Sequence, residues 1–133
     1  MFDEKKLIEL AFDAQKFSYS PYSNFKVGAC VATRDGNYIQ GANIENAAYG
    51  CTMCGERNAV FLAYCVGYTK DDIEAVCITS NCNPVASPCG SCRQVLSELC
   101  LPNTKIICVS SLGDRLDLEV KDLLPYGFNK EQL

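Results

Sequence analysis

The chain has 133 residues, about the length of one domain, and we expect a single domain over residues 1–133. Its 16 acidic residues outnumber 12 scattered basic ones, and the net charge of −4 argues against nucleic acid or an anionic membrane as a partner. Histidine is absent, which excludes a Ser-His-Asp triad and a Cys-His dyad as the catalytic arrangement.

The hydrophobic pattern switches between the helical period and the strand period along the chain. In chain order it predicts a helix (4–17), two strands (25–33 and 38–42), a helix (about 52–66), a strand (73–80), a helix (about 89–99), two strands (105–110 and 115–118) and a short helix after residue 119. Helices join the later strands, so this order predicts an α/β protein. We expect a three-layer α/β/α sandwich with a mixed five-stranded sheet.

Ten cysteines are far more than average use explains. No apolar run is long enough to span a membrane, and the first residues, MFDEKK, lack the profile of a signal peptide. We therefore expect a cytoplasmic protein whose thiols are reduced. Some of them should bind a metal ion, and others should be small core residues. The six predicted core cysteines are Cys30, Cys65, Cys77, Cys82, Cys100 and Cys108.

Two cysteine motifs stand where a loop leads into a predicted helix. They are CTMCGER (residues 51–57) and SPCGSCR (residues 87–93). The first turn of a helix carries partial positive charge, which favours thiolates, the form of cysteine that binds metal. Two such helix starts facing each other predict a tetrahedral zinc site with one ion per chain.

Spacing alone leaves two zinc sites open. Four thiolates from both C-x-x-C pairs would make a closed, structural site. Alternatively Cys54, Cys89 and Cys92 bind zinc, and water holds the fourth position of a catalytic site. Glu56 favours the catalytic site, because a carboxylate two residues after a ligand can act as general acid and base on that water. We therefore expect that Cys51 is not a ligand.

Three thiolates on Zn²⁺ leave a net charge of −1, which weakens the ion as a Lewis acid. Arg57 and Arg93 each follow a key residue of one motif. Either guanidinium could donate hydrogen bonds to the sulfurs and withdraw charge, and Arg57 is the preferred candidate.

Cys54-Gly55-Glu56 followed by the PCGSC segment (residues 88–92) resembles the zinc-dependent cytidine deaminase superfamily, in its three-cysteine variant. Three further segments, SPYSNFKVGA (20–29), NIENAAY (43–49) and LLPYGF (123–128), resemble the short, homotetrameric cytidine deaminases that act on free nucleosides. The resemblance runs from about residue 7 to residue 128. Gly55 departs from the alanine that is frequent in the family, and Tyr126-Gly127 varies the tail.

The resemblance implies hydrolytic deamination of cytidine and 2′-deoxycytidine to uridine and 2′-deoxyuridine with release of ammonia, as in pyrimidine salvage. It implies that Glu56 moves protons between water, the cytosine ring and the departing ammonia. It also implies a set of substrate contacts and a homotetramer with shared active sites. Asn43 and Glu45 would hold the ribose 3′-hydroxyl, Phe25 and Gly55 would line the base pocket, and Ala47, Tyr49 and Phe128 would reach the site of a neighbouring subunit.

Other functions remain possible on sequence. A related aminohydrolase such as blasticidin S deaminase shares the metal motif, although the Asn43 and Glu45 segment favours cytidine. A scaffold around four cysteines predicts that Glu56 has no chemical role. A thiol–disulfide oxidoreductase would need a thioredoxin-like β-α-β start, which this chain lacks.

Overall fold

The computed structural model describes residues 1–133 as three α-helices and five strands, with four short 3₁₀ turns. The helices are α1 (Glu4–Asp13), α2 (Gly55–Cys65) and α3 (Gly90–Leu99). The strands are β1 (Val27–Thr33), β2 (Tyr38–Ala42), β3 (Ile73–Ser80), β4 (Lys105–Val109) and β5 (Arg115–Glu119). The 3₁₀ turns are Ala14–Phe17, Tyr49–Cys51, Val120–Asp122 and Lys130–Gln132.

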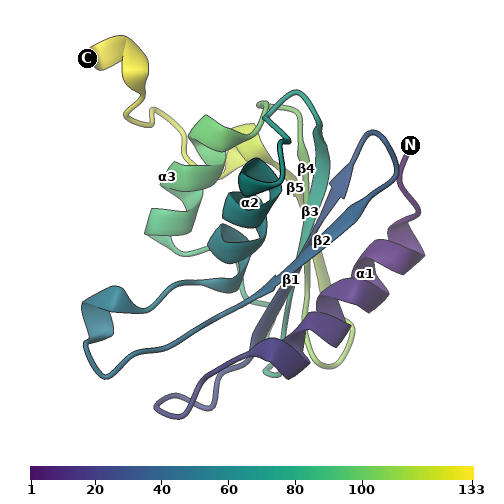
Figure 1. Ribbon diagram of the computed structural model, residues 1–133, viewed down its shortest axis with the longest axis vertical. Coiled ribbons are helices and arrows are strands. Elements are labelled where there is room, and N and C mark those ends of the chain that lie inside the picture. The colour runs from purple at the N-terminus through teal and green to yellow at the C-terminus, as the bar shows by residue number, and fades with distance from the viewer.

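The five strands form one mixed sheet in the order β2-β1-β3-β4-β5. Only β3 and β4 run parallel, because α3 carries the chain back between them, whereas the other neighbours are antiparallel. Figure 1 shows α1 on one face of the sheet and α2 with α3 on the other. The predicted three-layer α/β/α sandwich is confirmed.

Both faces of the central strands are covered, so β1 is buried along its whole length. One apolar cluster joins α1 to this sheet through Leu7 and Ala11, and a second joins α2 and α3 to the other face. Helix α1 packs unusually close to β1 at Gly28, where an added Cβ would lie 2.0 Å from the carbonyl oxygen of Ala11. Only glycine permits this approach.

Four of the six predicted core cysteines are buried: Cys30, Cys77, Cys100 and Cys108. Burial raises the pKa of Cys30, Cys100 and Cys108 to about 12, so these thiols stay protonated and unreactive. The core prediction is wrong for Cys65 and Cys82, which are exposed. Cys65 is the last residue of α2, and Cys82 lies in the loop after β3, where no layer of helices covers it.

Element ends differ from the prediction where the backbone makes a specific local contact. The second helix begins at Gly55 and not at residue 52, because Ile44 and Met53 exchange two backbone hydrogen bonds of 2.9 Å and keep the chain extended up to Cys54. The first strand begins at Val27, since Asn24 has a positive φ of 56° and turns the preceding chain. The predicted last helix is the 3₁₀ turn Val120–Asp122.

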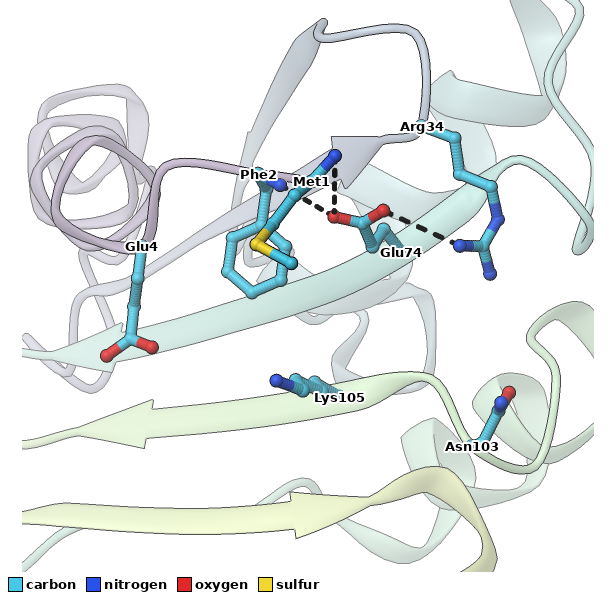
Figure 2. A pocket seen from close by; sticks show the side chains of 7 residues that line it. All are labelled: Met1, Phe2, Glu4, Arg34, Glu74, Asn103 and Lys105. Atoms are coloured by element: carbon cyan, nitrogen blue, oxygen red, sulfur yellow. Dashed lines mark hydrogen bonds and ion pairs between the residues drawn. The ribbon is translucent and has the colours of Figure 1, made fainter.

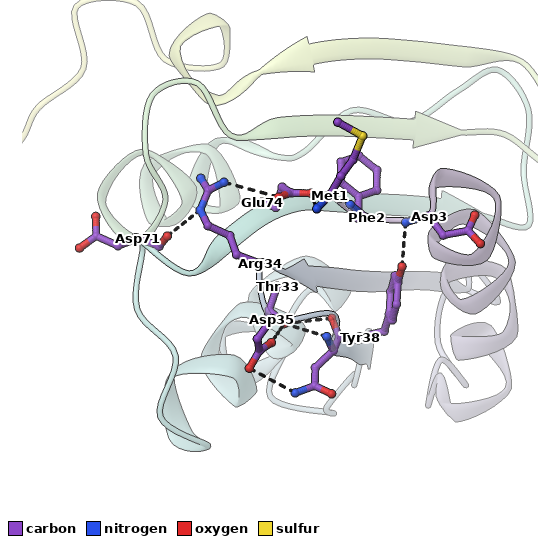
Figure 3. Close-up of polar contacts among 10 residues, drawn as sticks. Met1, Phe2, Asp3, Thr33, Arg34, Asp35, Tyr38, Asp71 and Glu74 are labelled. Atoms are coloured by element: carbon purple, nitrogen blue, oxygen red, sulfur yellow. Dashed lines mark hydrogen bonds and ion pairs between the residues drawn. The ribbon is translucent and has the colours of Figure 1, made fainter.

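The N-terminus is hydrogen-bonded to the first residues of β2 and β3 (Figures 2 and 3). The Phe2 N–H donates to Glu74 Oε1 over 2.6 Å, and Arg34 Nη1 lies 3.5 Å from the other oxygen of that carboxylate. The Asp3 N–H donates to the Tyr38 hydroxyl over 2.9 Å. These contacts fix the start of α1, which then runs along β1 to Gly28. None of the helices is long and apolar enough to span a membrane.

Candidate metal centre and active site

Three cysteine sulfurs meet where α2 and α3 begin, on the same face of the sheet (Figure 1). Cys54 and Cys89 are the N-cap residues of the two helices, both with extended backbone, and Cys92 lies in the first turn of α3. Their Sγ atoms all lie within 4.8 Å of one another, with Cys54 3.7 Å and Cys92 3.4 Å from Cys89. Helix dipoles of both helices therefore act on the cluster.

The cluster has the donor set that zinc prefers, namely thiolates close enough to share one ion. A hydrogen bond from Cys92 is the chief cause that lowers the pKa of Cys54 to about 5, so one thiolate is present near neutral pH. Cys51 is exposed in the turn Tyr49–Cys51 and is not part of the cluster. With Cys51 outside, Cys54, Cys89 and Cys92 would hold the ion with three ligands, which would leave one position of a tetrahedral site for water.

Arg57 reaches the cluster from the first turn of α2. Its Nη2 donates to Cys54 Sγ over 3.2 Å, and this hydrogen bond raises the pKa of the guanidinium. Its Nε is buried without a partner. The guanidinium thus places positive charge against the thiolates, as expected for the preferred arginine.

Arg93 binds two main-chain carbonyls and the Ser87 hydroxyl, and no sulfur. Its Nε donates to the Pro88 carbonyl over 2.7 Å, Nη1 to the Leu123 carbonyl over 3.0 Å, and Nη2 to the Ser87 hydroxyl over 2.9 Å. Arg93 therefore braces the loop before Cys89 against the C-terminal segment. The prediction that it could share charge neutralisation at the sulfurs is not supported by these contacts.

Glu56 is a buried carboxyl group beside the cluster, with 5% of its surface exposed. It follows Cys54 by two residues in the first turn of α2 and borders the same cavity. Burial is the main cause that raises the pKa of Glu56, and the Cys54 thiolate adds to it. A raised pKa makes the carboxyl group a better proton acceptor than an exposed glutamate, which suits a general acid and base.

A cavity of about 300 Å³ opens over the cluster, within the size of small-molecule sites. It brings together seven of the predicted residues from four parts of the chain. They are Phe25, Asn43, Glu45, Cys54, Gly55, Glu56 and Cys89. A larger cavity of about 570 Å³ lies at the other end of β1 and β3, beside Met1 and Glu74 (Figure 2), and contains none of them.

Gly55 packs tightly at the floor of the cavity. A Cβ at this position would lie 3.1 Å from Val27 Cγ1 and 3.2 Å from the Val27 carbonyl oxygen. An alanine would need Val27 to move by a few tenths of an ångström. The glycine that departs from the family pattern therefore lets β1 and the start of α2 approach more closely here.

Asn43 is held by the chain segment that precedes β1. Its Oδ1 accepts from the Val27 N–H over 3.0 Å and from the Ser18 hydroxyl over 2.5 Å, and its Nδ2 donates to the Phe25 carbonyl over 2.7 Å. One amide hydrogen remains for a ligand. Most of this side chain's hydrogen-bonding capacity is thus structural, which the sequence did not reveal.

Three of the predicted substrate-binding residues lie outside the cavity. Ala47 and Tyr49 are exposed, and the Tyr49 ring contacts only Tyr22 among the aromatic side chains, edge-on at 6.0 Å. Phe128 is 58% exposed on the C-terminal tail, which extends away from the sheet (Figure 1). Gln94 fixes this tail by donating to the Phe128 carbonyl over 2.9 Å.

The cavity also contains residues to which the sequence assigned no role. They are Ser23, Val27, Thr52, Ile78, Ser80, Ala86 and Ser87. Ser23, Val27, Thr52 and Ser87 belong to the quoted motifs, so membership of those segments was the available signal. Ile78 and Ser80 follow from the end of β3 facing α2, which only the sheet register shows.

Comparisons with known proteins agree with this geometry. The family described as the cytidine and deoxycytidylate deaminase zinc-binding region matches residues 1–108. A cytidine deaminase of Halalkalibacterium halodurans is 43% identical over 131 residues, covering 98% of both chains. A probable cytidine deaminase of Dictyostelium discoideum is 32% identical, covering 97% of this chain and 86% of that protein.

Solved structures agree as well. The cytidine deaminase from Burkholderia pseudomallei superposes with a TM-score of 0.92 at 40% identity, covering 95% of this chain and 99% of that one. The enzyme from Mycobacterium tuberculosis gives 0.81 at 33% identity, covering 96% and 98%. Sequence and structure together confirm the resemblance seen in the motifs. This chain, with its three-thiolate zinc-binding cluster, belongs to the cytidine deaminase family.

Proposed function

We propose that the protein hydrolyses the C4–N4 bond of cytidine and 2′-deoxycytidine, which gives uridine or 2′-deoxyuridine and ammonia. We propose further that it acts as a single cytoplasmic domain in pyrimidine salvage. The observation that carries the proposal is the shared cavity. One space joins a zinc-binding thiolate cluster, a buried carboxyl group with a raised pKa, and polar side chains suited to a sugar. That combination of a metal, an acid–base group and a sugar site fits hydrolytic deamination of the base of a nucleoside.

Cys54, Cys89 and Cys92 would hold one Zn²⁺, which when bound lowers the pKa of a water molecule and so supplies a nucleophile at neutral pH. Glu56 takes the proton that this water loses and delivers it to N3 of the cytosine ring, which makes C4 electrophilic. The water oxygen bonds to C4, the C4–N4 bond breaks, and Glu56 helps transfer the remaining proton to the leaving ammonia. Arg57 offsets the excess negative charge of three thiolates.

The rest of the cavity would orient the nucleoside. Phe25, which is half-buried, would pack against the pyrimidine, and Gly55 would border the ring. The remaining amide hydrogen of Asn43 and the carboxylate of Glu45 would bind the ribose 3′-hydroxyl. These assignments are supported by the positions of the four residues around one cavity.

The proposal is tested by ammonia release from cytidine, 2′-deoxycytidine and blasticidin S with purified protein of known zinc content. We expect turnover of both pyrimidine nucleosides and none of blasticidin S. Ammonia from blasticidin S alone would replace the proposal by the related aminohydrolase. Bound zinc without turnover of any of the three would contradict a deaminase and favour a structural metal site.

We also propose that the chain forms a homotetramer whose active sites are shared. Phe61, Leu62 and Val66 leave an apolar face of α2 exposed, with 36%, 46% and 59% of their surfaces accessible. Exposed apolar patches of this kind mark protein interfaces. Tyr49 and Phe128 are also exposed, and neither borders the cavity of its own chain.

Shared sites predict complementation between two impaired variants. Glu56→Gln and Phe128→Ala should each form a tetramer by light scattering, and each should be much less active than the wild type. Refolded together, they should regain activity above either variant alone, because Glu56 of one chain meets Phe128 of another. A fully active monomer, or a mixture with no gain, would contradict shared sites.

A further inference from the structure

The carboxylate of Glu45 is enclosed by the loop that precedes β1. The N–H groups of Tyr22 and Ser23 donate to Oε1 over 2.9 and 3.2 Å, and the Ser23 hydroxyl donates to Oε2. A carboxylate offers about four acceptor positions, two on each oxygen. The loop uses both positions on Oε1 and one on Oε2, so one acceptor on Oε2 remains for a ligand in the cavity.

Ser23 makes two contacts with its single hydroxyl. It donates to Glu45 and accepts the Phe25 N–H over 3.0 Å. Asn24, at a positive φ of 56°, turns the chain between these two contacts, a conformation that asparagine tolerates well. The hydroxyl therefore joins a residue proposed for the sugar to the backbone of the residue proposed for the base. Both residues border the cavity together with Ser23 itself.

We propose that Ser23 is a positioning residue for the ribose, which orients the free acceptor of Glu45 Oε2 toward the 3′-hydroxyl of the nucleoside; this inference rests on the proposed function. The two N–H groups donate to Oε1 and make no hydrogen bond to Oε2. Only the Ser23 hydroxyl contacts Oε2 from within the chain. Its loss therefore removes the constraint on the oxygen that would meet the substrate.

The Ser23 hydroxyl also keeps Glu45 ionised. It is the largest cause that holds the pKa of Glu45 below its ordinary value of 4.5, ahead of the Tyr22 and Ser23 N–H groups. A lowered pKa means that the wild-type carboxylate remains charged as the pH falls. Without the hydroxyl the pKa rises, and the carboxylate gains its proton at a higher pH.

The test compares wild type, Ser23→Ala and Ser23→Thr with cytidine and with 3′-deoxycytidine. For cytidine we expect Ser23→Ala to raise KM about tenfold, the cost of one hydrogen bond to a charged group, with kcat within about twofold of wild type. Ser23→Thr, which retains the hydroxyl, should restore KM. For 3′-deoxycytidine the two KM values should agree, because the hydroxyl that Glu45 would bind is missing.

The pH dependence gives a second readout. As the pH falls from about 6 toward 4.5, the ordinary pKa of a glutamate, the ratio of the Ser23→Ala KM to the wild-type KM for cytidine should increase. The ratio cancels protonation of the substrate itself. Thr69→Ala is the matched control, since Thr69 also donates its hydroxyl to a carboxylate, that of Asp72, while its N–H contact remains. Thr69 is exposed and lies outside the cavity, so this variant should have wild-type kinetics.

The outcomes separate this inference from the proposed function. Wild-type protein that does not turn over cytidine would overturn both. Wild-type turnover with an unchanged cytidine KM in Ser23→Ala would overturn only the role of Ser23. An equal rise in KM for cytidine and 3′-deoxycytidine would also overturn it, because it would show a general distortion of the cavity.

Discussion

Replacement of Glu56 by glutamine is expected to lower kcat by about 10²- to 10⁴-fold, the usual contribution of a general acid and base. The amide has nearly the shape of the carboxyl group but cannot accept and release a proton. Glu56 is not among the clustered thiolates, so zinc content should stay at about one ion per chain. Turnover of cytidine by ammonia release and zinc by mass spectrometry on the same sample provide the two measurements.

Glu98→Gln is the matched control for this experiment. Glu98 also lies on a helix that begins at the cluster, α3, but its side chain is exposed and does not border the cavity. The control should keep both activity and zinc. Glu56→Gln protein that retains wild-type kcat would show that another group moves the proton.

Replacement of Cys92 by serine is expected to abolish zinc binding. Because the zinc ion supplies the nucleophile, kcat should fall by more than about 10³-fold. Cys92 is fully buried beside the other two sulfurs, so water cannot easily take the place of its sulfur. The hydroxyl of serine is similar in size but is a poor zinc ligand at neutral pH. Zinc per chain and thermal unfolding with and without a chelator measure the loss directly.

Two cysteine variants separate ligand loss from other effects. Cys51→Ser should keep zinc and activity, because that thiol is exposed and outside the cluster. Cys100→Ser should lower stability, since it buries a hydroxyl in an apolar region, and still keep zinc. Loss of zinc from Cys51→Ser would restore the closed four-thiolate site, and zinc retained by Cys92→Ser would remove Cys92 from the ligand set.

The secondary structure could be predicted closely because the residues of each element carry its period. The bounds of β2 and β3 agree with the prediction, and the helix over residues 90–99 differs by one residue. The helix predicted from residue 52 begins later, at Gly55, since Met53 pairs with Ile44. That bridge joins residues nine positions apart in a segment without strand periodicity. The local hydrophobic pattern therefore does not predict the pairing of Ile44 with Met53.

The candidate site was predictable to the extent that its chemistry is local. Two cysteines three residues apart at the start of one helix, and a glutamate two residues after the cysteine at the start of another, indicate a metal and its proton carrier by their types and spacing. Spacing could not decide whether Cys51 is a fourth zinc ligand or whether water holds that position. It also could not decide whether Arg57 or Arg93 donates to the sulfurs. Those choices depend on directions in space, and the structure turns Arg93 toward Pro88 and Leu123 and away from sulfur.

The sequence by itself determined the fold class through its periods, the family through the resemblance of its motifs, and the candidate thiolates and Glu56 through residue type and short spacing. Only the tertiary structure decided that Cys65 and Cys82 are exposed, that Asn43 is mostly committed to the backbone of Phe25 and Val27, and that Ser23 holds Glu45. Each of these depends on contacts between segments that are distant in the chain. Such contacts are set by how the layers pack, and no local pattern records them.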